Sequence, residues 1–207
     1  MKEIRDNGLL PGNGHWTMIA ADLKPRLKDL WERPTLAASD LEAAKKAMLS
    51  WTCACADEEG AAYYALEHNR PSSNDAPLLI SFEADAADMI VDGRDFLFTL
   101  FQLGDPPKAR PLAERLFGPA LLRYVDRAWQ TADQQERIAL CKLAVQDDEV
   151  IVAHAANQTV IGGRYGTRFC SAFLIRTPVA RSAILDVGPV EIDFDLPVAE
   201  ITLDMII

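Results

Sequence analysis

Apolar positions in the first part of the chain follow helical spacing. Pro25 lies inside this run, so the predicted helix either begins near Pro25 or kinks there. Residues 7–13 precede the run and are rich in Gly, Pro and Asn, which predicts a loop. A second helix, up to about Leu49, is predicted by the capping box of Ser39 and Glu42. The residues that set the first helical spacing are Ile19, Leu23, Leu27, Leu30 and Trp31.

The stretch from Trp51 to Gln102 is the part of the chain in which predicted strands, turns and helices alternate most often. A strand is expected to end just before Asp57, which is a preferred residue type at a helix N-cap. The helix after Asp57 carries the tyrosine pair at residues 63–64 among small residues, which would let it lie close against a sheet. Residues 77–82 (PLLISF) predict a buried strand. The run FLFTLF, from residue 96, fits either a strand or a short helix.

Residues 108–157 predict a helical insert between two β-bearing parts of the chain. Within this insert, residues 147–157 are assigned to helix rather than strand. From Arg168 onward, short β-rich runs alternate with turns. We therefore expect a single α+β domain over residues 1–207, with small antiparallel or mixed sheets flanked by helices.

The formal charge of −10, from 21 basic and 31 acidic residues, narrows the classes of partner. Nucleic acids and anionic membranes both attract a basic face, so we expect neither as a partner. No apolar run approaches the roughly 20 residues of a membrane span. The first residues also lack the basic-then-apolar order of a signal peptide. A cytoplasmic location is the default expectation.

The cysteines and histidines are too dispersed to predict a metal site. Cys53 and Cys55 share one face of a strand, but no C-x-x-C pair or nearby histidine completes a zinc set. We therefore expect no metal, and buried thiols at these two positions and at Cys141 and Cys170. His154 lies among alanines and apolar residues and is interpreted as a core residue rather than a catalytic one.

No strong catalytic motif is present in the sequence. Gly162 and Gly163, with Gly166 close behind, are similar to part of a phosphate cradle, but no helix follows to hold the anion. A hairpin or a crossing loop is the preferred interpretation, because glycine pairs mostly supply backbone freedom. Arg164 and Arg168 have no acidic neighbour in sequence and form a candidate anion-binding pair.

The order of elements in the first hundred residues resembles that of ADP-ribosyltransferase-like domains. In that family a His-x-Thr strand leads into a helix. A threonine-led strand, an acidic turn, a helix with paired aromatics and a further strand follow later. The resemblance covers roughly half of the chain. The matching positions are His15, Thr17, Thr52, Asp57, Tyr63, Tyr64 and the strand over residues 78–83.

The resemblance implies that NAD+ binds as a co-substrate in a cleft between two small sheets. His15 would hydrogen-bond the adenosine ribose, and Thr17 would brace that site. Tyr63 or Tyr64 would stack on the nicotinamide ring, whose positive charge adds a cation–π attraction. Tyr63 is assigned to cofactor binding and Tyr64 to catalysis, and Arg164 is assigned to a phosphate contact.

The resemblance also implies a late catalytic glutamate, often in a Glu-x-Glu pattern, which we assign to Glu191. Glu191 and Asp193 have the spacing that puts two carboxylates on one strand face, and Glu200 is the other candidate. Such a carboxylate would stabilise the oxocarbenium-like ribose as nicotinamide leaves. The expected function is transfer of ADP-ribose from NAD+ to an acceptor such as a protein, or a degenerate relative of that activity.

Two other functions stay open on the sequence. One is a non-enzymatic interaction or assembly domain that binds a protein partner through its acidic surface and helical insert. In that case the C-terminal run ITLDMII would be an edge strand suited to pairing with another subunit in a homo-oligomer. The other is a small-molecule-binding domain that performs no reaction.

Overall fold

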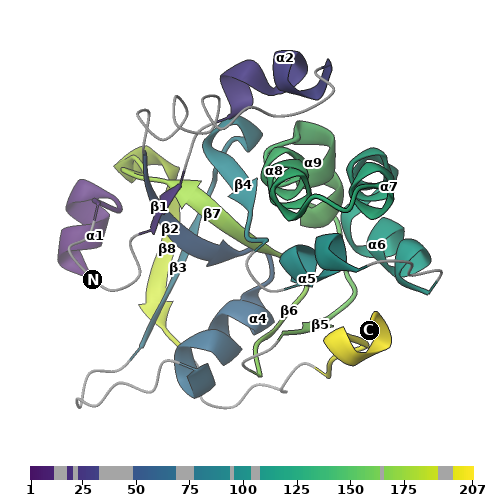
Figure 1. Cartoon of the computed structure of the whole chain (residues 1–207). Helices are drawn as coiled ribbons and strands as arrows, with labels where there is room; N and C mark the ends of the chain where they lie inside the picture. The colour runs from purple at the N-terminus through teal and green to yellow at the C-terminus, as the bar shows by residue number, and fades with distance from the viewer. Residues whose placement is uncertain are drawn as a thin grey trace.

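In the computed structural model of the chain, the described residues form three small sheets beside a layer of helices (Figure 1). This α+β architecture agrees with the fold class expected from the sequence. The structure describes residues 1–11, 18–20, 23–32, 49–68, 77–93, 96–103, 108–163, 166–190 and 198–207. The strands are β1 (Met18–Ala20), β2 (Leu49–Cys55), β3 (Leu78–Phe82), β4 (Met89–Val91), β5 (Ile161–Gly162), β6 (Arg168–Phe169), β7 (Ala172–Arg176), β8 (Ile184–Pro189) and β9 (Ile201–Thr202). The helices are α1 (Lys2–Asn7), α2 (Leu27–Glu32), α4 (Glu58–Tyr63), α5 (Phe96–Gln102), α6 (Ala109–Phe117), α7 (Leu122–Gln130), α8 (Gln134–Ala144) and α9 (Asp148–Ala155).

An antiparallel sheet of order β1-β2-β7-β4 joins the two β-bearing parts of the chain. Side chains alternate between its faces because successive residues of a strand point in opposite directions. Phe173 and Ile175 of β7 lie on the face that packs against the helices, in the main core. On the other face, Trp51 and Leu174 form a smaller cluster with Ile90. One face of this sheet therefore supports the helical layer.

The predicted helical insert is confirmed by α6, α7, α8 and α9. Aspartates cap two of these helices, and aspartate is a preferred residue type at a helix N-cap. Asp133 accepts a hydrogen bond from the Gln135 amide at 2.8 Å, and Asp147 accepts one from the Glu149 amide at 2.9 Å. The open choice for the run FLFTLF is resolved as helix α5, which buries Phe96, Leu97, Thr99, Leu100 and Phe101.

Of the two alternatives for the first apolar run, the structure confirms a helix that begins near Pro25, and the run before Pro25 contains a strand. Met18–Ala20 form β1, with Met18 opposite Trp51 of β2. The helical part starts near Pro25, in a short 3-10 turn that leads into α2. Backbone pairing with β2 therefore prevails over the helical spacing of the apolar residues. The predicted capping box at Ser39 lies outside the described residues.

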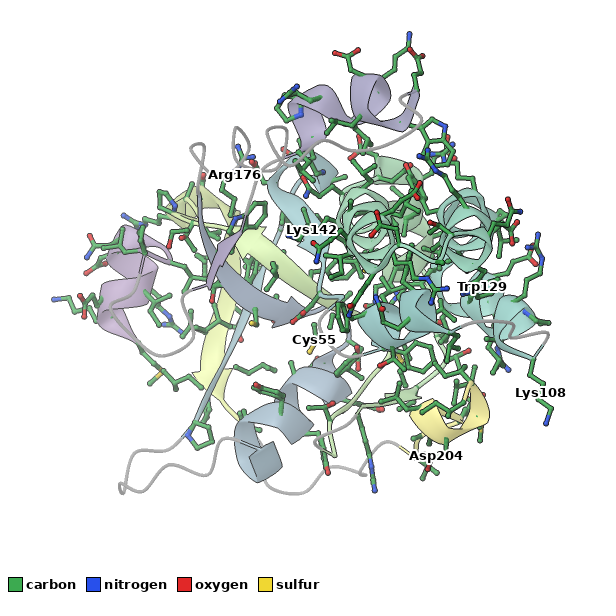
Figure 2. The ribbon with its side chains drawn as sticks, in the orientation of Figure 1. Cys55, Lys108, Trp129, Lys142, Arg176 and Asp204 are labelled. Carbon is green, nitrogen blue, oxygen red and sulfur yellow. The ribbon has the colours of Figure 1, made fainter. Side chains whose placement is uncertain are left out.

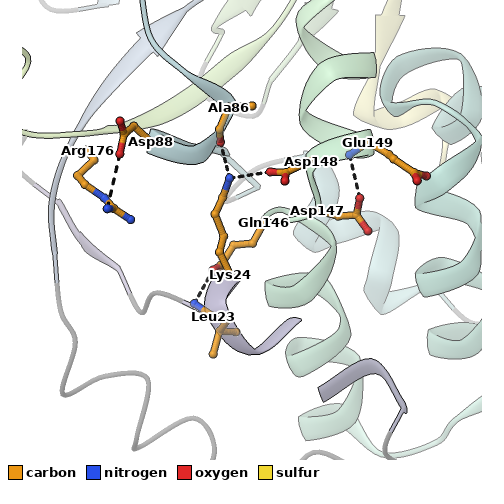
Figure 3. A network of polar contacts seen from close by, with 9 residues as sticks. All are labelled: Leu23, Lys24, Ala86, Asp88, Gln146, Asp147, Asp148, Glu149 and Arg176. Carbon is orange, nitrogen blue, oxygen red and sulfur yellow. Dashed lines mark hydrogen bonds and ion pairs between the residues drawn. The ribbon is translucent and has the colours of Figure 1, made fainter. Parts of the chain in front are cut away.

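Polar contacts hold the segment before α2 against the helices (Figure 3). The Leu23 amide donates to Gln146 Oε1 at 2.6 Å, and Leu23 itself is fully buried. Lys24 Nζ donates to the Ala86 carbonyl and pairs with Asp148 at 3.0 Å. The Asp148 side chain is 73% exposed, so its ion pair with Lys24 contributes only about 0–1 kcal/mol.

The remaining sheets are short. Strands β3 and β8 form an antiparallel pair, and β6, β5 and β9 form a three-stranded sheet. The glycine-rich stretch after Ile161 connects β5 to antiparallel β6, which confirms the hairpin interpretation. Strand β9 lies at the edge of its sheet and pairs with β5 in parallel. Ile201, Leu203 and Ile206 of the C-terminal run are buried in the chain's own core.

Candidate functional site

The corner between β2 and α4 is built on the side chain of Asp57. Its Oδ2 accepts a hydrogen bond from the Gly60 amide at 2.8 Å, as the N-cap of α4, which confirms the sequence prediction. Its Oδ1 accepts from the Cys170 amide at 2.9 Å and from the Ser171 amide at 3.3 Å. One carboxylate therefore holds both the start of α4 and the connection between β6 and β7.

That connection, residues 170–172, is also held from the helical layer. His154 Nε2 accepts a hydrogen bond from the Ala172 amide at 3.2 Å. The Asn157 side-chain amide donates to the Cys170 carbonyl at 2.6 Å. We call residues 170–172 the hub, because side chains from α4's N-cap, from α9 and from the second residue after α9's end all bind its backbone.

His154 is a core residue with both ring nitrogens bonded, as predicted. It is 2% exposed, and its Nδ1 donates to the Leu116 carbonyl at 2.9 Å. Its ring stacks on the ring of Phe117, with the two ring centres 4.5 Å apart, and lies edge-on to the ring of Phe173, with the centres 5.3 Å apart. Burial lowers the pKa of His154 to about 4, so the ring is neutral at pH 7. The accepting Nε2 also requires this neutral form.

Asp57, His154 and Ser171 have the composition of a catalytic triad but not its geometry. Such a triad needs the base bonded to the nucleophile and the acid bonded to the base. Here both nitrogens of His154 bond main-chain groups, and both oxygens of Asp57 accept from main-chain amides. The buried Ser171 Oγ has no hydrogen-bond partner among the described residues. These groups hold the fold, and they do not form a Ser-His-Asp relay.

Tyr63 and Tyr64 lie where α4 ends. Tyr63 is the last residue of α4, and Tyr64 begins a π-helical turn that runs to His68. Both tyrosines are half-buried. The guanidinium of Arg168 on β6 lies 5.5 Å from the centre of the Tyr63 ring, within cation–π range. The structure therefore brings together two residues that the sequence assigned to separate candidate groups.

Close packing between α4 and β6 makes Gly60 a test of this corner. We expect Gly60→Ala to lower the free energy of unfolding by about 1 kcal/mol. Alanine would gain up to about 1 kcal/mol in helix propensity. However, its Cβ would lie 2.3 Å from Asp57 Oδ2 and 2.8 Å from Phe169 Cβ, and overpacking costs about 1–3 kcal/mol. Urea unfolding followed by circular dichroism measures the change.

Gly188→Ala is the matched control for this substitution. A Cβ at Gly188 would meet Asp186 Oδ2 at 3.6 Å, an ordinary contact, so this variant should unfold like the wild type or slightly later. A Gly60→Ala variant that is more stable than the wild type would contradict the close approach of α4 to β6.

The four cysteines, all of them described, form no disulfide, and three of them are only partly buried. Cys141 is buried, whereas Cys53, Cys55 and Cys170 are half-buried, so the prediction of four buried thiols is right for one residue. Burial, followed by the charge of Asp57, raises the pKa of Cys55 to about 12 and that of Cys170 to about 11. Both thiols are therefore protonated at pH 7 and are poor nucleophiles. Figure 2 shows Cys55 at the end of β2 that leads to α4.

Most of the predicted site residues lie outside the described part of the chain. This applies to His15, Thr17, Arg164 and Glu191. The second candidate glutamate, Glu200, is described and forms an exposed ion pair with Arg115 at 2.9 Å. The structure therefore places Tyr63, Tyr64 and Glu200 and leaves the other assignments as predictions.

Asn157 was not singled out in the sequence analysis, although a signal for it exists. Its Oδ1 accepts from the Thr159 amide at 3.0 Å, which is the local turn that asparagine favours. An Asn two residues before a Thr, just past the C-cap of a helix, would have indicated such a turn. The contact with the Cys170 carbonyl had no local signal, because 13 positions separate the two residues.

Among the described residues, no group of three or more His, Cys, Asp or Glu side chains could hold a metal ion. None of the helices among the same residues has the length and apolar character that a membrane span requires. The chain matches no protein-family model, no curated protein and no solved structure.

Proposed function

We propose that this chain is an ADP-ribosyltransferase-like protein that uses NAD+ as a co-substrate, or a degenerate relative of such an enzyme. The supporting observation is the geometry of the first two strands. Strand β1 runs antiparallel to β2, with Met18 opposite Trp51 and Ala20 opposite Leu49. The amino end of β1 therefore points toward the carboxyl end of β2, from which Asp57 leads into α4. In the sequence, the His-x-Thr motif comes directly before β1, and the tyrosine pair ends α4.

The division of the strands into separate small sheets also supports the proposal, because the family holds NAD+ between two small sheets. The four-stranded sheet and the β3–β8 pair are two such antiparallel units. On its own this feature is common to many α+β proteins, so it adds less support than the relation between β1, β2 and α4.

In the proposed reaction, the bond between ribose C1′ and the nicotinamide nitrogen breaks, and nicotinamide leaves with the bonding electrons. A nucleophilic group of the acceptor forms the new bond to C1′ and releases its proton to solvent. Glu191 would stabilise the oxocarbenium-like ribose between these events. The proposal assigns Glu191 and Tyr64 to catalysis, and His15, Thr17, Tyr63 and Arg164 to NAD+ binding.

The Arg168 contact bears on which tyrosine would stack on nicotinamide. A guanidinium already lies over the Tyr63 ring, and a cationic nicotinamide on the same face would meet like charge. The proposal therefore favours Tyr64, or the opposite face of Tyr63, for the stacking contact.

Thermal unfolding with and without millimolar NAD+ tests the proposed function. A ligand at about 100 times its dissociation constant stabilises the native state by about 2.7 kcal/mol, which corresponds to a rise in Tm of roughly 5 °C or more for a chain of this size. We expect this rise for the wild type and for Lys108→Ala, an exposed control position. His15→Ala and Tyr64→Ala should show little or none of it relative to their own melting temperatures.

Release of nicotinamide, measured by liquid chromatography, separates an active enzyme from a degenerate one. A rise in Tm with released nicotinamide supports the enzyme, and a rise without release supports the degenerate relative. A wild-type chain that shows neither response would contradict the proposal in both forms.

An interaction or assembly domain is the alternative function. Its support is apolar exposure in the C-terminal segment, where Val198 is 78% and Ile207 is 82% exposed. Strand β9 in the same segment is at a sheet edge, where another chain could pair. Exchange of Val198 and Ile207 for serine should then lower the mass of any oligomer in solution. A wild-type mass of 22.9 kDa at every concentration would contradict the homo-oligomeric form of this alternative.

A further inference from the structure

The start of the chain covers the outer edge of strand β8. Arg5 Nη2 donates a hydrogen bond to the Val187 carbonyl at 2.7 Å. Leu9 and Val179 exchange two backbone hydrogen bonds, of 3.0 and 2.8 Å. Figure 1 shows α1 beside the β3–β8 sheet, and α1 contacts both β8 and the 3-10 turn before it. Residues 2–9 are called the strap below.

The register of the β3–β8 sheet shows which groups the strap covers. The Val190 amide donates to the Pro77 carbonyl, and bonded pairs alternate with non-bonded pairs along an antiparallel ladder. Val187, opposite Ile80, therefore occupies a non-bonded position, and its N–H and C=O point away from β3. The bond from Arg5 to the Val187 carbonyl agrees with this orientation. The strap thus lies on an edge that offers hydrogen-bonding groups to another strand.

Few contacts hold the strap in place. Helix α1 has six residues, none of them buried, and a helix this short does not form alone in water. The turn after it depends on Gly8, which has φ +74°. A Cβ at Gly8 would lie 2.2 Å from the Val179 carbonyl oxygen. Within the strap only Gly8 is buried, and Ile4 and Leu9 are half-buried, so the strap should open at a lower free energy than the core.

We propose that the strap is detachable and that its release lets β8 pair with β8 of a second copy of this chain. A two-stranded sheet is marginal by itself, and joining two such sheets edge to edge would give one four-stranded sheet. Pairing about a two-fold axis at Val187 makes the same edge complementary to itself. Leu185, which is 63% exposed on this strand, adds apolar contact. Pro189 lacks an N–H and limits the length of the new ladder.

This inference rests on the strap and β8 alone and is independent of the proposed use of NAD+. The test is a double variant, Arg5→Ala with Gly8→Ala, which removes the side-chain bond and the turn geometry. Lys2→Ala, on the exposed surface of α1, is the control. The mass of each protein is measured by light scattering after size exclusion over a range of concentrations. The double variant should have twice the mass of the wild type. The control should have the wild-type mass.

Hydrogen exchange shows whether the strap has opened. Amides of α1 should exchange at least about tenfold faster in the double variant, and the Val187 amide should become slower as the dimer forms. Adding Leu185→Lys to the double variant places a charge on the pairing edge and should restore the wild-type mass.

Two results would overturn the proposal. One is a double variant whose α1 amides exchange freely while its mass stays that of the wild type. The other is a dimer that persists after Leu185→Lys. If circular dichroism shows that the double variant does not fold, Arg5→Ala alone replaces it, because this single variant retains the Gly8 turn. Its mass and its amide exchange are then measured in the same way. Faster exchange in α1 without any increase in dimer in that variant would equally overturn it.

Discussion

Replacing Asp57 with alanine will lower the free energy of unfolding by about 3 kcal/mol. The loss of a helix N-cap costs about 1 kcal/mol. Asp57 also accepts from the amides of Cys170 and Ser171, and an amide left without a partner in a buried region costs about 1–3 kcal/mol. The Ser171 residue is buried, so water would not fully replace the lost acceptor. Urea unfolding followed by circular dichroism gives the change directly.

Asp133→Ala is the matched control for the Asp57 substitution. Asp133 is also an N-cap, but it is exposed and accepts from one described amide, that of Gln135, so its loss should cost about 1 kcal/mol. Asp57→Asn retains one acceptor oxygen, so its free energy of unfolding should lie between those of the wild type and Asp57→Ala. Equal losses in Asp57→Ala and Asp133→Ala would show that the two bonds to the hub contribute nothing measurable.

Acid will destabilise the wild type by about 3 kcal/mol through His154 alone. The pKa of His154 is about 4 in the folded chain, because burial disfavours the charged ring, and is 6.5 in the unfolded chain. The unfolded state therefore binds a proton that the folded state rejects as pH falls from 6.5 toward 4. The stability from this residue is complete above pH 6.5 and declines across that window. By pH 5 the loss should be about 2 kcal/mol.

His154→Gln tests this assignment because glutamine is neutral at every pH. We expect the variant to be less stable than the wild type at pH 7.5, since its side chain does not reproduce the stacking on Phe117. The difference in free energy of unfolding between the two proteins should narrow as pH falls to 5, because only the wild type loses stability through His154. The carboxylates titrate in both proteins and cancel in the comparison. Urea unfolding at several pH values measures it, and parallel stability curves for the two proteins would contradict the buried neutral histidine.

The two substitutions address opposite sides of the hub. Asp57 binds residues 170–171 from the corner that carries Tyr63 and Tyr64, and His154 binds Ala172 from the helical layer. The helical insert is thus connected to α4, which ends at Tyr63, through hydrogen bonds from the hub's backbone amides to the side chains of Asp57 and His154. Loss of either side chain should loosen that connection, whichever proposed function is correct.

Local signals in the sequence were sufficient for several elements. Asp57 and the acidic residues after it predicted the start of α4, because a carboxylate satisfies free amides at a helix N-terminus within a few residues. The helical insert and the strand β3 followed from the spacing of apolar residues in the same way. The positions of Tyr63 and Tyr64 at the end of α4 were therefore predictable, whereas His15, Thr17, Arg164 and Glu191 remain predictions.

The sequence by itself determined the α+β class, the helical insert and the Asp57 cap of α4, because these depend on residues close together in the chain. The tertiary structure alone decided that Met18–Ala20 form a strand, that FLFTLF forms a helix, and that Asp57, His154 and Asn157 meet at the hub. Each of these outcomes depends on partners far away in sequence. Asp57 and Cys170, for example, are separated by 113 positions. Hydrogen bonds and burial available only in the folded chain outweigh the small differences between local preferences.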